Sequence, residues 1–180
     1  MWIIAGVAEV LMAHKNDPEK YHINDTLFDH YNKYMDLCIG LIQDRLKKKR
    51  IRDFQDTKRP SFLFDIKAWG DHIDNKYARS ENSSFPDTRK VKKVRKIGWD
   101  ISHARRFVNF FKTMHEFKMD DHQSFPDTTT LKYIANNFAY NVFNGNYEKP
   151  LFSNYMNGAN GWYRFGYHCD KCGYAPYDLS

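Results

Sequence analysis

The feature that most constrains the fold is a run of apolar side chains that recurs at helical spacing through the first quarter of the sequence. Its members are Leu27, Tyr31, Tyr34, Met35, Cys38, Leu41, Ile42 and Leu46. Residues three and four apart share one face of an α-helix. The pattern therefore predicts an amphipathic helix, capped at its start by Asn24 or Asp25. Lys47–Arg50 would form its last turn, where cations complement the helix C-terminus.

Three further segments read as helices. Residues 2–14 are nearly all apolar, which is typical of an inner, buried helix. A second helix is expected to start near Asp100 or Ser102 and to run to about Lys118. A third is expected from about Asp127 to Asn144, where Asn-Gly provides a stop signal. Cys38 lies on the apolar stripe of the amphipathic helix, so we interpret it as a core residue and not as a nucleophile.

The remaining segments are less regular. Residues 51–97 form a long irregular excursion, in which SFLFDIKAW (61–69) is either a strand or a short helix. Residues 145–180 form a tail rich in aromatic residues, Gly and Asn, which we expect to be ordered because exposed aromatic rings are costly in water. The pentapeptide SFPDT occurs at 84–88 and again at 124–128, and either an internal repeat or shared turn chemistry explains it.

Length and composition bound the class of protein. The 180 residues, 42% of them hydrophobic, suit a single domain over residues 1–180 with a real core and a mainly α fold. The apolar N-terminal stretch lacks a basic leader and is interrupted by Glu9, so no signal peptide is visible. It is also too short to span a bilayer, so no membrane span is expected.

The net charge of +6 is concentrated in two stretches, KKKRIR (47–52) and RKVKKVRK (89–96). Such clusters attract nucleic acid, anionic polysaccharide or a membrane surface, and they also occur as solvated connectors. Phosphate contacts through Lys47–Arg52 and Lys90–Lys96 would make the chain a basic helical nucleic-acid-binding module. Both interpretations stay open from the sequence.

The stretch IGWDISHARR (97–106) is the leading candidate site. Asp100 can cap the following helix, and His103 follows one turn later on the same side. A carboxylate can orient and charge an imidazole, which is what a general acid or base requires. Trp99 offers a stacking face, and Arg105 and Arg106 can hold a carboxylate or phosphate. A capped helix with a satisfied His and exposed arginines is the structural alternative.

Two weaker candidates lie in the tail. Cys169 and Cys172 form half of a zinc ribbon, but a second pair is absent and any metal would need a further ligand such as His72 or His122. Two thiols or a local disulfide are the simpler interpretation, so no metal site and no cofactor are predicted. Trp162 and Tyr163, set among Asn-Gly turns, either line a carbohydrate cleft or pack on the core. Walker, GxGxxG, GxSxG and HExxH motifs are absent.

The order of WIIAGVAEVLMAH, YNKYMDLCIGLI, WDISHARRFVNFF and NGANGWYRFGY resembles the helical hairpins of the (α/α) toroid superfamily, which includes glycoside hydrolases, polysaccharide lyases and sugar epimerases. An acid-x-Ser-His-Ala stretch at the start of an inner helix lines the central cleft in several such proteins. The resemblance covers about 100 residues. It implies that Asp100 and His103 are cleft positions and that Trp99 is a sugar platform.

This resemblance leads to the expected function. It implies a carbohydrate-active or carbohydrate-binding protein, of glycoside hydrolase or polysaccharide lyase type if it is an enzyme. The charge favours an acidic polysaccharide, and substrate contacts would come from Trp99, Arg105, Arg106, Trp162 and Tyr163. About five helices form only part of a ring, so self-association or a further segment is expected, and the resemblance points to an extracellular or periplasmic location. The alternatives are the nucleic-acid-binding module and a non-catalytic structural or interaction protein.

Overall fold

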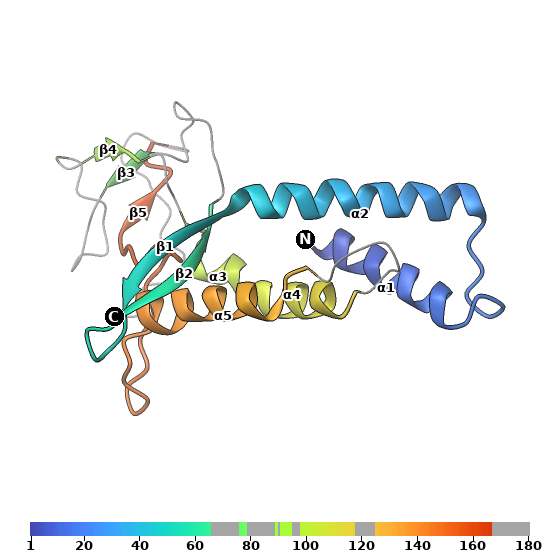
Figure 1. Ribbon diagram of the computed structural model, residues 1–180. Coiled ribbons are helices and arrows are strands. Elements are labelled where there is room, and N and C mark those ends of the chain that lie inside the picture. The colour runs from blue at the N-terminus through green and yellow to red at the C-terminus, as the bar shows by residue number, and fades with distance from the viewer. Residues whose placement is uncertain (66–75, 79–88, 90, 95–97, 118–124, 167–180) are drawn as a thin grey trace. The chain divides into compact units, whose positions relative to one another are not determined.

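The structure is a computed structural model that describes residues 1–65, 76–78, 89, 91–94, 98–117 and 125–166. About half of these residues are helical, and helical residues outnumber strand residues (Figure 1). The structure therefore agrees with the expectation of a mainly α fold, as far as helix content is concerned. In chain order the elements are α1 (Trp2–Asn16), α2 (Asp25–Arg45), β1 (Leu46–Arg52), β2 (Lys58–Phe64), β3 (Lys76–Ala78), β4 (Val91–Lys93), α3 (Ile101–Ala104), α4 (Phe107–Glu116), α5 (Thr128–Asn137), the π-helix η3 (Phe138–Val142) and β5 (Trp162–Tyr163).

The chain divides into two compact units. Met1–Asp44 and Arg106–Leu131 form what we call the helical unit, and Arg45–Arg105 and Lys132–Ser180 form the mixed unit. Helix α5 begins in the first and continues in the second. The prediction of one domain over residues 1–180 stays a prediction.

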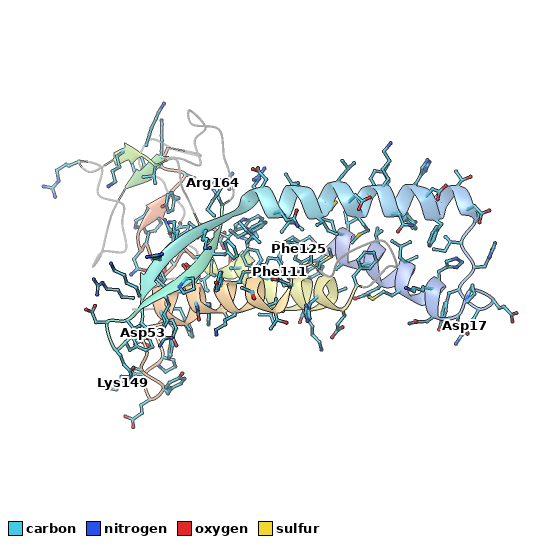
Figure 2. The ribbon with its side chains drawn as sticks, in the orientation of Figure 1. Asp17, Asp53, Phe111, Phe125, Lys149 and Arg164 are labelled. Atoms are coloured by element: carbon cyan, nitrogen blue, oxygen red, sulfur yellow. The ribbon has the colours of Figure 1, made fainter. Side chains whose placement is uncertain are left out.

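The core of the helical unit is built by α1 and α4. Helix α4 buries Phe107, Phe110, Phe111 and Met114, whose spacing of three, four and seven residues sets them on one face. Helix α1 contributes Ala8 and Leu11, both with no exposed surface. Each large apolar side chain buried in this way contributes about 1.5–3 kcal/mol. Figure 2 shows Phe111 among the side chains of this core.

Helices α1 and α2 form a hairpin through the loop of residues 17–24. The His14 imidazole at the end of α1 donates to the Tyr21 carbonyl at 3.1 Å, and its ring lies 5.4 Å from that of Phe28. Asn24 caps α2 as predicted, since its Oδ1 accepts the Leu27 N–H at 2.9 Å. Two local interactions thus set the turn between the helices.

The structure corrects two expectations for this unit. Helix α1 forms as predicted but is not an inner helix, because Trp2 is 70% and Ile3 is 84% exposed. Helix α2 ends at Arg45, so Leu46 and the Lys47–Arg50 turn do not belong to it. Those residues start strand β1, because pairing with β2 supplies backbone hydrogen bonds that override the helical pattern.

The mixed unit contains two small antiparallel sheets. One is the β1–β2 hairpin, whose register sets Lys48 opposite Phe62 and Arg52 opposite Lys58. The other has the order β4-β3-β5. Segment 61–69, expected as a strand or a short helix, is a strand as far as Phe64. The excursion of residues 51–97 contains β2, β3 and β4, so it is less irregular than expected.

The remaining helices follow their predicted starts more closely than their predicted ends. Asp100 caps α3, but the helix expected to reach Lys118 is interrupted at Arg105 and Arg106 before α4 begins. Asp127 caps α5, whose Thr130 N–H donates to Asp127 Oδ1 at 2.7 Å. The second SFPDT copy therefore ends in a helix cap, while residues 84–88 lie outside the described part. None of the described helices combines the length and apolarity that a membrane crossing requires.

Candidate functional site

The candidate site is the turn Trp99–His103, which opens helix α3 in the mixed unit. Asp100 has the extended backbone of an N-cap residue, and its Oδ1 accepts the His103 N–H at 3.0 Å. The second carboxylate oxygen, Oδ2, lies 2.6 Å from Nδ1 of the His103 ring. One side chain therefore both starts the helix and holds the imidazole, as the spacing predicted.

The Asp100 carboxylate is also bound by the hydroxyl of Ser102, which donates to Oδ1. Three donors on two residues thus share one carboxylate whose side chain is 13% exposed, while the His103 side chain is 43% exposed. Because its Nδ1 contacts the carboxylate, the ring is fixed in orientation, and no described residue forms a hydrogen bond with its other nitrogen, Nε2. Such an arrangement suits a general base or a hydrogen-bond donor.

Trp99 lies beside this pair. Its ring centroid is 6.1 Å from that of His103 with an interplanar angle of 61°, and it stacks on Phe64 of β2 at 6.0 Å and 15°. Asp65, the next residue, pairs through its backbone with Gly98. The β1–β2 hairpin therefore supports the turn from a distant part of the sequence, a contact that no local pattern in the sequence signals.

A loop of the tail supports the turn from the other side. The Met156 N–H donates to the Trp99 carbonyl at 2.7 Å, and the Ile101 N–H donates to the Asn154 carbonyl at 2.8 Å. Asp100 pairs with Tyr155 between them in an antiparallel bridge. The two backbone segments are so close that a Cβ at Gly98 would lie 2.5 Å from the Asn157 nitrogen, so only glycine fits there.

Asn137 at the end of α5 and Asn141 in η3 hold the same loop in place. Asn137, which is 1% exposed, donates from Nδ2 to the Met156 carbonyl at 2.8 Å, and Asn141 donates to that carbonyl at 3.3 Å. Buried amides of this kind hold backbone that regular secondary structure does not. The described part of the Asn- and Gly-rich tail thus positions the candidate site, a role that its composition did not reveal.

The predicted substrate-binding residues lie in different parts of the fold and differ in exposure. Arg105 is exposed at the end of α3. Arg106 belongs to the helical unit, where its guanidinium lies 5.3 Å from the Trp2 ring centroid. Trp162 is half-buried in β5, opposite Ala78.

Tyr163 is 3% exposed and packs its ring against Tyr155 at 4.3 Å. Its hydroxyl accepts a hydrogen bond from Asn157 at 3.2 Å. It is therefore a core residue of the β3–β5 pair and does not offer the exposed stacking face that we expected.

The structure does not test the predicted cysteine pair or its possible histidine partners. Cys169, Cys172, His72 and His122 lie outside the described residues. Within the described ranges, no group of three His, Cys, Asp or Glu side chains is placed to hold a metal ion. Burial raises the pKa of the Cys38 thiol, and the thiolate is the nucleophilic form, so its environment disfavours a role as a nucleophile.

Comparison with known proteins does not assign this chain to a family. Neither protein-family models, nor curated proteins, nor solved structures give a match to this chain. The functional argument therefore rests on the geometry of the turn Trp99–His103 and on the charges around it.

Proposed function

We propose that this chain is a carbohydrate-active protein of the polysaccharide lyase type and that the turn Trp99–His103 is its site. The observation that carries the proposal is the 2.6 Å contact between Asp100 and His103, which leaves a 43% exposed imidazole with one nitrogen engaged. The half-buried indole of Trp99 beside it supplies an aromatic surface of the kind on which sugar rings pack.

The hydrogen bonds at Asp100 favour a mechanism with a histidine base over a mechanism with two catalytic carboxylates. Hydrolysis of a glycoside requires one carboxylate that gives a proton and a second that acts as nucleophile or base. Asp100 accepts bonds from Ser102, from the His103 backbone and from the His103 ring, so its oxygens are committed to positioning. His103 is the group that can exchange a proton with a ligand.

Elimination on a uronate is the chemistry that matches this arrangement. In this step His103 Nε2 removes the proton from the carbon next to the uronate carboxyl, the neighbouring carbon–oxygen glycosidic bond breaks, and a carbon–carbon double bond forms. The departing sugar oxygen takes up a proton from water, and His103 returns its own proton to the solvent. A cation near the uronate carboxylate stabilises the transition state, and the exposed Arg105 is the nearest candidate in sequence.

The finer fold assignment belongs to the same proposal. We propose that the helices are part of an (α/α) toroid. The α1–α2 hairpin and the packing of α1 with α4 support this view, because such rings are built from consecutive helical hairpins. A further copy or segment would then complete the ring. A non-catalytic carbohydrate-binding role would use the same turn.

A panel of polysaccharides tests the proposed function. The chain is incubated with polygalacturonate, alginate and a neutral glucan, and product is followed through the ultraviolet absorbance of the new double bond. We expect product from a uronate polymer and a loss of about 10²–10⁴-fold in His103→Ala, the range typical of general-base removal. Unchanged product formation in His103→Ala, or no binding of any carbohydrate by the intact chain, would refute the proposal.

A further inference from the structure

The β1–β2 hairpin has a face with an unusual concentration of positive charge. Its register places Lys48, Arg50 and Arg52 of β1 on the same face as Lys58 of β2, and all four side chains are exposed. Alternate residues of a strand lie about 7 Å apart, so the three β1 cations form a row about 14 Å long. We call these four residues the cationic face.

This arrangement carries a local cost. Arg52 and Lys58 are directly opposite each other, and like charges in that position destabilise a strand pair. Asp56 offsets part of that cost through an ion pair with Arg52 at 2.6 Å, whereas Arg50 and Lys58 have no ion pair with any described residue. A local conflict of this kind is typical of functional surfaces.

The same face continues into the candidate site. Following β2 from Lys58, the residues on this face are Pro60, Phe62 and Phe64, and Phe64 stacks on Trp99. Phe62 contacts Tyr133 of α5 at 5.5 Å, and the Lys48 ammonium lies 5.9 Å from that same ring. Along this face, Arg52 and Lys58 lie at the hairpin tip, Lys48 lies beside the rings of Phe62 and Tyr133, and Phe64 contacts Trp99 of the candidate site, all within the mixed unit.

We propose that the cationic face binds an anionic polysaccharide and leads it toward His103. The inference rests on the proposed function and names its substrate class, a polymer that bears carboxylates at regular intervals. Each exposed cation interacts weakly by itself, but the four cations of the cationic face act together on a polyanion through their summed field. The nearby rings suit a ligand that has both charge and flat apolar sugar faces.

Binding to polygalacturonate, measured by isothermal titration calorimetry with the full chain, tests this inference. The test variant is Arg50→Gln with Lys58→Gln, which removes two cations that have no described partner. The matched control is Lys33→Gln with Lys112→Gln, which makes the same charge change on exposed positions of the helical unit. We expect the test variant to bind on the order of tenfold more weakly and with less salt dependence, and the control to stay within about twofold.

Several outcomes would overturn the inference. Equal weakening in both variants would mean that bulk charge attracts the polymer. Preferential binding of single-stranded oligothymidylate that is lost only in the test variant would assign the face to nucleic acid.

The proposed function and this inference can fail separately. If the intact chain cleaves polygalacturonate through His103 and the test variant binds and cleaves it like the wild type, only the inference fails. If polygalacturonate binds through the cationic face but Trp99→Ala and His103→Ala change neither affinity nor product formation, only the proposed function fails. Melting curves of all variants check that each is folded.

Discussion

The Asp100 carboxylate lies 2.6 Å from the His103 ring nitrogen Nδ1 and, through its other oxygen, caps the helix that presents that ring. Capping and imidazole orientation are thus separable functions of one side chain, because an amide can cap a helix but offers the ring a donor as well as an acceptor and no negative charge.

Asp100→Asn is therefore expected to separate stability from function. Asn is as good an N-cap as Asp, so the melting temperature should stay close to that of the wild type. The amide presents a donor as well as an acceptor to Nδ1, which disturbs the ring tautomer, and product formation should fall by about 10²-fold or more. Asp100→Ala should lose the cap as well, at a cost of about 0.5–2 kcal/mol in unfolding free energy. Equal losses of stability in the two variants would contradict this separation.

Gly98→Ala should destabilise the mixed unit. A Cβ at this position would lie 2.5 Å from the Asn157 nitrogen, which is backbone and has little room to move. Overpacking of this kind costs about 1–3 kcal/mol. Gly40→Ala is the control, because nothing lies within 4 Å of a Cβ there and alanine favours the helix by about 0.5–1 kcal/mol. Urea unfolding of both variants should give changes of opposite sign, and a neutral Gly98→Ala would argue against the close approach of the two segments.

Asp127 should make α5 sensitive to acid. The Thr130 hydroxyl, followed by the Thr130 N–H, holds the pKa of the Asp127 carboxyl below its usual range. Because the pKa is lower in the folded state, the Asp127 carboxylate stabilises the fold fully above the ordinary carboxyl pKa of about 3.9. This stabilisation is lost as the pH falls through the lower folded pKa. Asp127→Ala should cost about 0.5–2 kcal/mol near neutral pH and much less in acid.

Asp127→Asn keeps a cap that does not titrate, so it isolates the charge from the hydrogen bond. Its effect on unfolding free energy should be small at neutral pH, and the acid-dependent loss should be reduced. If unfolding free energies of wild type and Asp127→Asn fall in parallel from pH 5 to pH 2, the ionised cap is not the source of the acid sensitivity.

Asn137→Ala should loosen the loop that supports the candidate site. The Asn137 amide is buried and donates to the Met156 carbonyl, so its loss leaves that acceptor with the longer bond from Asn141. A buried acceptor left without any partner costs about 1–3 kcal/mol, and the remaining bond from Asn141 places the expected loss toward the lower end of that range. Asn109→Ala, at an exposed position of α4, should stay within about 0.5 kcal/mol. Equal melting temperatures for the two variants would show that the clamp is unimportant.

Local chemistry was predictable from the sequence where the structure is set within a few residues. The caps by Asn24, Asp100 and Asp127 were predictable because each satisfies backbone donors two or three residues later. The approach of His103 to Asp100 followed from the same helical spacing. These contacts depend on neighbours in the chain, so a sequence pattern can indicate them.

The features that the sequence did not predict depend on contacts between segments that are distant in the chain. Lys47–Arg50 reads equally well as a helix end, and only pairing with β2, which begins eight residues after Arg50, makes it a strand. The stack of Phe64 on Trp99 and the clamp by Asn137 join segments that no periodicity connects. The exposure of Trp2 and Ile3 runs against the rule that an all-apolar helix is buried, so the sequence alone predicted the wrong environment.

The most direct test of the central claim follows the His103 imidazole itself. In ¹⁵N-labelled protein, the Nε2 resonance is recorded while galacturonate oligosaccharides are titrated into the full chain. If the turn Trp99–His103 is the site, this resonance shifts in step with binding, and the shift disappears in Trp99→Ala. A saturated complex in which the His103 nitrogens keep their free positions, while resonances elsewhere move, would contradict the account.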